Sequence, residues 1–291
     1  MIKKIKEENM SWGEIWKAFL FGIVEGITEW LPISSTGHMI LLQEFVTLKM
    51  SDKFMEMFFV VIQLGAILAV VLLYWKKLFP FSFKKGFKIK ISILQMWFKI
   101  IFACIPAAVI GILFDDQLNA WFYNYQTVSI MLILFGILFL VIENMNYGKK
   151  PQIVKISQIT YQTAFLIGLF QLIAAVFPGT SRSGATIIGG LLIGMSRTIA
   201  AEFTFFLAVP VMFGASFLKL IKFGIAFESD EIAVLLVGMV VAFVVSILSI
   251  KFLMGYIKKN NFKAFGWYRI VLGILVLLYF GIQTVLQFLA V

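Results

Sequence analysis

The sequence predicts an all-α polytopic membrane protein. Of its 291 residues, 61% are hydrophobic and only 14% are charged, whereas soluble domains average about 45–50% apolar and about 25% charged residues. Apolar runs of roughly 20 residues, the length that crosses a bilayer, recur from one end of the chain to the other. Six full spans are expected, at residues 54–75, 92–114, 127–143, 199–221, 232–254 and 268–290.

Two further apolar stretches, 19–48 and 160–195, are interrupted by polar segments. The first contains LPISSTG at 31–37, and the second contains FPGTSRSG at 177–184. Pro with nearby Gly and Ser ends a helix. The halves that remain, about 10–15 residues each, are too short to cross the bilayer. Each stretch is therefore expected to form a re-entrant helical hairpin.

The two hairpins indicate an internal repeat within a single membrane domain, 1–291, with copies at about 12–148 and 157–291. Each copy holds one re-entrant hairpin and three transmembrane helices, and an odd number of spans inverts the second copy relative to the first. Inverted repeats with broken helices place binding sites near the midplane, so the two polar breaks should face each other. Similar residues lie 146 positions apart in the pairs Gly22 and Gly168, Pro32 and Pro178, Ser35 and Ser181, and Glu56 and Glu202.

Loop charges predict the orientation. Lys-rich loops at 76–90, 149–155 and 251–263 are expected on the cytoplasmic side, while 115–126 and 223–231 lack this excess and are expected outside. Both termini would then lie outside, although Lys3, Lys4 and Lys6 disagree with that. The net charge of +10 is explained by these loops, so no nucleic-acid partner is expected. The single cysteine, Cys104, excludes an internal disulfide and a cysteine-based metal site.

The first hairpin carries acidic and hydroxyl groups close to its break. Glu25 and Glu29 are four residues apart and share one helix face. Inside an apolar segment, two such carboxylates need a cation, a proton or a basic partner. Ser34 and Ser35 either cap the second half-helix or offer a nucleophile to a nearby base. His38 is the only histidine of the chain and is either structural or part of the site.

The second hairpin has the composition of an anion cradle. Its small residues and helix N-terminus present N–H groups and a positive dipole end. Arg182 supplies a planar fork suited to phosphate, or alternatively pairs with Glu25 or Glu29. Further donors are the hydroxyls of Thr180, Ser181, Ser183 and Thr186. Together the hairpins predict a ligand with a phosphate or diphosphate head and a lipid tail, and spacing does not separate a phosphatase from a transporter.

These segments resemble one known family. The motifs EGITEWLPISSTGH at 25–38 and PGTSRSGAT at 178–186, with IQLGAILAV at 62–70, GMSRTIAAEFTFFLAVP at 194–210 and FGWYRIVLG at 265–273, are similar to those of the undecaprenyl-diphosphate phosphatase (bacitracin-resistance) family. The resemblance covers essentially the whole chain beyond the first ten residues. It implies removal of the terminal phosphate of undecaprenyl diphosphate, which recycles the carrier lipid for cell-wall peptidoglycan synthesis and confers bacitracin resistance.

The resemblance also implies a location and a cofactor. The lipid head would be handled at the outer face of the bacterial cytoplasmic membrane with the help of a divalent cation, Mg²⁺ or Ca²⁺, held near Glu25 and Glu29. The family's Ser and His positions fall on Ser34, Ser35 and His38. Its second motif falls on Ser181, Arg182, Ser183 and Thr186. An acidic residue that often precedes the IQLG motif in the family is replaced here by Phe59.

For the reaction, we expect Arg182 and the hydroxyls of its hairpin to hold the diphosphate. Ser35 is the preferred nucleophile, with Glu29 or His38 as the base, and attack by a water that Glu29 activates is the alternative. A mechanism that needs two histidines is excluded, because the chain has one.

Two other functions are compatible with parts of the same sequence pattern. A transporter that flips the monophosphate lipid suits an inverted repeat, but it needs no cluster of hydroxyl, carboxylate and imidazole groups. A non-catalytic lipid-binding scaffold leaves the intramembrane Glu pair and Arg182 unexplained. The small residues Gly189, Gly190 and Gly194 would serve either a homodimer contact or internal packing.

Overall fold

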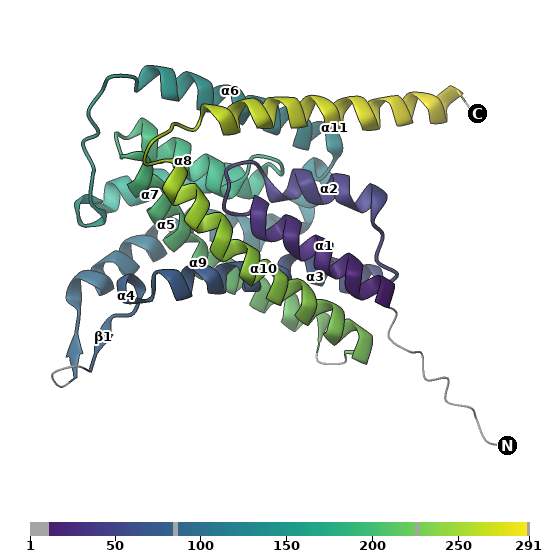
Figure 1. Cartoon of the computed structure of the whole chain (residues 1–291), viewed down its shortest axis with the longest axis horizontal. Helices are drawn as coiled ribbons and strands as arrows, with labels where there is room; N and C mark the ends of the chain where they lie inside the picture. The colour runs from purple at the N-terminus through teal and green to yellow at the C-terminus, as the bar shows by residue number, and fades with distance from the viewer. Residues whose placement is uncertain (1–11, 84–86, 225–226, 290–291) are drawn as a thin grey trace.

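The computed structural model describes residues 12–83, 87–224 and 227–289, and these are almost entirely helical (Figure 1). Within them, six helices are long and apolar enough to cross a membrane. They are α3 (Asp52–Leu73), α5 (Ile91–Phe122), α6 (Tyr125–Met145), α9 (Arg197–Phe223), α10 (Ser229–Tyr256) and α11 (Lys263–Leu289). The six expected spans are confirmed, and the chain is a multi-pass membrane protein.

The end of α5 differs from the prediction. Its apolar part stops at Phe114, where the sequence suggested a loop from 115 to 126, but the helix continues to Phe122. No Gly or Pro stands between 115 and 122, so nothing interrupts the backbone hydrogen bonds when the apolar run ends. The predicted loop is therefore wrong over this part. It shrinks to the short turn at Tyr123 and Asn124, which caps α6.

The connection between α3 and α5 has some structure of its own. It contains the short helix α4 (Trp75–Leu78) and a small antiparallel ladder of β1 (Phe81–Ser82) with β2 (Lys88–Ile89). In Figure 1, α4 and β1 lie at one end of the bundle, opposite the end at which α11 finishes.

The two interrupted stretches are pairs of short helices, as predicted. The first pair is α1 (Trp12–Thr28) with α2 (Ser35–Phe45), and the second is α7 (Tyr161–Val176) with α8 (Arg182–Leu192). At about 1.5 Å per residue, α2 and α8, with 11 residues each, reach only about half of a hydrocarbon core of about 30 Å. A short 3-10 helix, η1 (Ile156–Gln158), precedes α7.

Four of the helix contacts form matched pairs. Helix α1 packs along α10 while α7 packs along α5, and α3 contacts α9 while α6 contacts α11 along their lengths (Figure 1). A two-fold repeat would produce this pairing, since it exchanges α1 with α7 and α5 with α10. The inverted repeat itself stays a prediction.

Glycines allow the closest of these approaches. A Cβ added to Gly168 of α7 would lie 2.2 Å from the Ala103 carbonyl oxygen of α5. Gly189 and Gly190 likewise face Phe170 and Ala200 of this same chain. These two small residues of α8 therefore serve internal packing, and the homodimer remains a prediction without a surface assigned to it.

A buried carboxylate ties together the ends of three helices. Glu143 near the end of α6 is 2% exposed, and it accepts hydrogen bonds from the guanidinium of Arg197 and from the backbone N–H of Phe262. The same end of the bundle is closed by backbone bonds from Gln152 and Ile153 to the Gly194 carbonyl. This end is thus fixed independently of the hairpin loops.

Candidate active site

Each hairpin turns through a serine with a left-handed backbone. Ser34 has φ 75° and Ser181 has φ 67°, and within the described residues no other non-glycine residue has a positive φ. Each is the N-cap of the helix that follows, since Ser34 Oγ accepts from the Gly37 N–H and Ser181 Oγ accepts from the Gly184 N–H. Backbone strain of this kind costs about 1–3 kcal/mol and concentrates at functional sites.

The capping serines correct one detail of the predicted repeat. Ser181 was aligned with Ser35, but the structure gives Ser181 the same capping role as Ser34. The reason is loop length: two residues separate Pro178 from its capping serine, and one separates Pro32 from Ser34. Ser35 therefore occupies the first helical position of α2, as Arg182 does in α8.

The two loops meet at Glu29. The Ser35 hydroxyl donates to Glu29 Oε2 at 2.8 Å, and Arg182 Nη2 donates to Glu29 Oε1 at 2.7 Å. Both members of the ion pair are largely buried, with side-chain exposures of 14% for Arg182 and 9% for Glu29. One carboxylate thus joins a hydroxyl from its own hairpin to a guanidinium from the other. The expectation that the two breaks face each other is confirmed.

Hydroxyl groups of the second hairpin hold this arrangement in place. Ser183 Oγ donates to the Glu29 backbone carbonyl at 3.1 Å, and Thr186 Oγ1 donates to the Arg182 carbonyl at 2.9 Å. Arg182 Nη1 reaches the Thr204 carbonyl of α9 at 3.3 Å. Ser183 and Thr186 are each 1% exposed, so in this state they fix the loop backbone from within.

Several buried polar atoms around the site have no hydrogen-bond partner in the part of the chain that the structure describes. Besides Trp30 Nε1 and Arg269 Nε, they include Glu25 Oε1 and Thr180 Oγ1, on residues that are 1% and 0% exposed. Leaving such an atom unpaired costs about 1–3 kcal/mol. Glu25 and Thr180 therefore have unused capacity to contact a ligand or an ion, one from each hairpin.

His38 uses both ring nitrogens away from Ser35. Its Nδ1 lies 2.7 Å from the Ser34 carbonyl oxygen, and its Nε2 lies 2.7 Å from the Tyr268 hydroxyl. A carbonyl oxygen only accepts, so Nδ1 carries a hydrogen and the neutral ring receives the Tyr268 hydroxyl at Nε2. The geometry therefore gives Glu29, of the two expected bases, the contact with Ser35, and it gives His38 a contact with the strained Ser34 backbone.

Arg269 is the main residue that the sequence reasoning missed. Its side chain, 0% exposed, donates to the carbonyls of Pro32 in the first loop and of Gly179 and Thr180 in the second, and also to Met131. It therefore ties the backbones of both loops to α11. The available signal was an arginine inside an apolar span, which usually marks a functional or paired position.

The site motifs have close counterparts in known proteins. The family description "Bacitracin resistance protein BacA" matches residues 18–275, which include both hairpins and Arg269. The chain belongs to the BacA family. The resemblance found in the motifs is thereby confirmed.

Three relatives show how closely this BacA-family chain follows its family. An undecaprenyl-diphosphatase of Desulfitobacterium hafniense is 72% identical over 273 residues, 94% of this chain and 98% of that protein. Undecaprenyl-diphosphatase 1 of Clostridium acetobutylicum is 68% identical, over 92% and 97% of the two chains. An undecaprenyl-diphosphatase of Enterococcus faecalis strain V583 is 57% identical, over 93% and 99%.

Proposed function

We propose that this chain hydrolyses undecaprenyl diphosphate to undecaprenyl phosphate and inorganic phosphate. The observation that carries the proposal is the hydroxyl–carboxylate–guanidinium chain of Ser35, Glu29 and Arg182 at the meeting point of the two hairpins. Relatives that are 57–72% identical over more than nine-tenths of the chain are undecaprenyl-diphosphatases. The reaction recycles the carrier lipid for cell-wall synthesis, and removal of the diphosphate form confers bacitracin resistance.

From these contacts we infer a role for each of Ser35, Glu29 and Arg182. Glu29 removes the proton that Ser35 already donates to it, and the Ser35 oxygen forms a bond to the terminal phosphorus. The bond from that phosphorus to the bridging oxygen breaks, and undecaprenyl phosphate leaves with the electron pair. Water then hydrolyses the phosphoserine, which releases phosphate and restores the Ser35 hydroxyl. Arg182 compensates the negative charge of the transferring phosphoryl group.

The other polar groups bind the diphosphate head or position the loops that hold it. Thr180 and Ser181 contribute hydroxyls beside Arg182, and Ser34, Ser183 and Thr186 support the loop backbones or contact the head directly. His38 positions the first loop through the Ser34 carbonyl.

A divalent cation, Mg²⁺ or Ca²⁺, fits the first hairpin. Glu25 has a buried oxygen that no described residue contacts by a hydrogen bond, and Glu29 lies one helical turn further along. The described residues hold no cluster of three or more candidate metal-ligating side chains. Mg²⁺ is commonly held by one or two carboxylates together with substrate phosphates. Bound by Glu25 and Glu29, the cation would neutralise charge on the phosphate oxygens.

We place the protein in the bacterial cytoplasmic membrane, with the site open to the outer face. The Lys-rich segments around α4 and β1 gather at one end of the bundle (Figure 1), and such segments favour the cytoplasm. Helix α1 of the first hairpin begins at the opposite end from α4 and β1 (Figure 1). The prenyl tail would leave between helices into the lipid.

The test is phosphate release from a prenyl diphosphate by detergent-purified protein, with Mg²⁺ or Ca²⁺ present and then chelated. Ser35→Ala should lower turnover by about 10³-fold or more while the lipid still binds, because a covalent step loses its nucleophile. The matched control is Ser249→Ala in α10, a serine whose hydroxyl donates to the Val245 carbonyl of its own helix. Its turnover should stay at the level of the unmodified protein.

Other outcomes separate the alternatives. Substantial residual turnover in Ser35→Ala, combined with loss in Glu29→Gln and Arg182→Lys, assigns the attack to a water activated by Glu29. Well-folded protein that binds prenyl phosphate but releases no phosphate with any cation overturns the proposal. In that case the lipid-phosphate transporter becomes the leading function.

A further inference from the structure

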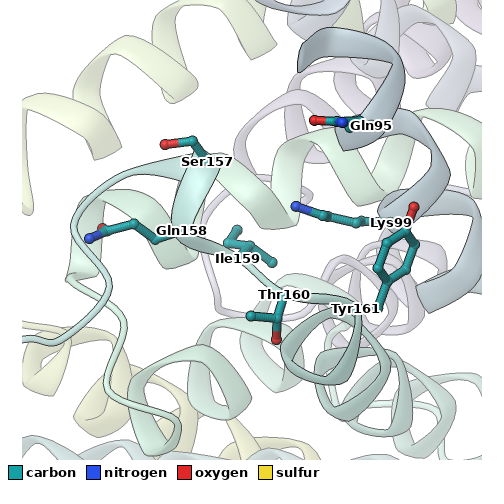
Figure 2. Close-up of a pocket in the computed structure, with 7 residues that line it drawn as sticks. All are labelled: Gln95, Lys99, Ser157, Gln158, Ile159, Thr160 and Tyr161. Carbon is teal, nitrogen blue, oxygen red and sulfur yellow. The ribbon is translucent and has the colours of Figure 1, made fainter. Parts of the chain in front are cut away.

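A cavity with basic side chains in its wall lies away from the hairpin loops. It has a volume of about 520 Å³ and is formed by α4, the first turns of α5, the η1 segment and the start of α9. A neighbouring cavity of about 350 Å³ shares Gln95, Lys99 and Ser157 with it (Figure 2). The larger volume lies in the range of about 300–1,000 Å³ typical of small-molecule sites.

The wall of the larger cavity is basic. Among the residues that the structure describes, four lysines line it, Lys76, Lys77, Lys99 and Lys155, against one carboxylate, that of Glu202. That carboxylate is already paired, since Lys77 Nζ lies 2.7 and 2.9 Å from its two oxygens. Within the described residues, no ion pair engages the other three lysines. The cavity therefore presents uncompensated positive charge.

Lys99 distinguishes this cavity from an ordinary basic loop. It lies more than two turns inside α5, within the apolar part that runs from Ile91 to Phe114. A cation at such a position is costly unless it faces water or an anion. Figure 2 shows its ammonium end directed away from α5 toward the segment that carries Ser157 and Ile159. The Lys99 ammonium also lies 5.8 Å from the centre of the Tyr161 ring.

The opposite wall has a fixed shape. The side-chain oxygen of Gln158 accepts from the backbone N–H groups of Val154 and Lys155 at 2.8 and 2.9 Å. These bonds fix the local backbone of the η1 segment, whose Ser157 lines both cavities. This part of the wall is therefore ordered before a ligand binds, which lowers the entropic cost of binding.

An apolar surface adjoins the cavity on α5 and α7. Phe98 and Phe102 of α5 and Tyr161 and Phe165 of α7 are exposed at 38–60%, and Phe102 contacts both Tyr161 and Phe165. Because they are exposed on apolar helices, these rings are available for contact with lipid. A ligand here thus meets positive charge at its head and aromatic side chains along its tail.

We propose that this cavity binds the phosphate head group of an anionic membrane lipid, at a site separate from the one that holds the diphosphate substrate. The lysines alone would also attract free phosphate. The adjoining aromatic surface favours the lipid, because free phosphate has no tail to bury there. Basic pockets between helices at the cytoplasmic side are suited to such head groups.

The test uses native mass spectrometry of the purified protein with added phosphatidylglycerol, and phosphatidylcholine as the neutral comparison. The double variant Lys99→Gln with Lys155→Gln should bind phosphatidylglycerol about tenfold more weakly or worse, because each lysine near a head group adds to affinity. The control is Lys149→Gln with Lys258→Gln, two lysines that flank α6 and α10 without lining the cavity. The control variant should bind phosphatidylglycerol with the affinity of the unmodified protein. Both double variants should have the melting temperature of the unmodified protein.

Three outcomes would overturn the proposal. Equal losses in both double variants would mean that overall charge attracts the lipid. Unchanged binding in the cavity variant would exclude the cavity. The third outcome is that the Lys99 and Lys155 substitutions weaken the binding of inorganic phosphate and leave the binding of phosphatidylglycerol unchanged. This would assign the site to the free anion.

Discussion

Arg269 offers the sharpest test of how the site is held together. Its Nη1 donates to the Pro32 carbonyl, while its Nη2 donates to carbonyls that include Gly179 and Thr180. Arg269→Lys keeps the charge but replaces the two terminal nitrogens, Nη1 and Nη2, by a single Nζ. The side chain then no longer reaches both loops at once. Losing two hydrogen bonds to a charged group costs about 3–6 kcal/mol, at about 1.5–3 kcal/mol each. If that energy aligns the loops, kcat falls by about 10²–10⁴, since about 1.4 kcal/mol is tenfold.

The assay compares turnover and melting temperature of Arg269→Lys with those of Arg197→Lys. Arg197 also bonds a buried acceptor, the Glu143 carboxylate, but at the closed end of the bundle. We expect Arg197→Lys to melt lower and to keep its turnover below that temperature. Arg269→Lys should lose turnover even where it remains folded. Turnover within about twofold of the unmodified protein would refute the positioning role, because such a change is below about 0.5 kcal/mol.

Three further predictions concern the frame around the site. Gly179→Ala should lose turnover in the phosphate-release assay, because Gly179 has φ +88° and a Cβ there would meet a backbone carbonyl of α6 at 2.5 Å; an active, equally stable variant would contradict this. Gly168→Ala should lower the melting temperature, because overpacking costs about 1–3 kcal/mol. The control Gly111→Ala should not lower it, because a Cβ there would meet no described atom within 4 Å. Equal melting temperatures of the two variants would refute the close-packing argument. Glu143→Gln should lower the melting temperature, because glutamine keeps one acceptor oxygen but loses the charge that pairs with Arg197; losing one hydrogen bond to a charged group costs about 1.5–3 kcal/mol, and unchanged melting would show that the pair contributes little.

The sequence determined the class of the protein and much of its chemistry. Membrane-spanning helices can be predicted directly from the sequence, because in the bilayer every backbone polar group of a spanning helix must form a hydrogen bond within that helix. The broken hairpins were equally readable, since Pro and Gly clusters end helices wherever they stand. Within the breaks, the intramembrane carboxylates and Arg182 are too costly to leave unpaired, so a pairing of Arg182 with Glu25 or Glu29 was one of the two alternatives that the sequence offered for this arginine.

Which partners meet was decided by tertiary structure. Arg182 had two candidate carboxylates in the sequence. The fold pairs it with Glu29 and leaves an oxygen of Glu25 without a hydrogen-bond partner among the described residues. His38 lies three residues after Ser35 in the sequence, which made it a candidate base. In the structure its Nε2 instead contacts the hydroxyl of Tyr268 in α11. No local pattern carries such information, because the contact joins residues 230 positions apart.

Arg269 makes the same point for the scaffold. From the sequence it is one arginine in an apolar helix, and only packing brings four backbone carbonyls within its reach. The sequence fixes which groups are too polar to be left in lipid. Long-range packing decides which of those groups satisfy one another, because hydrogen bonds depend on distances that helix periodicity does not determine.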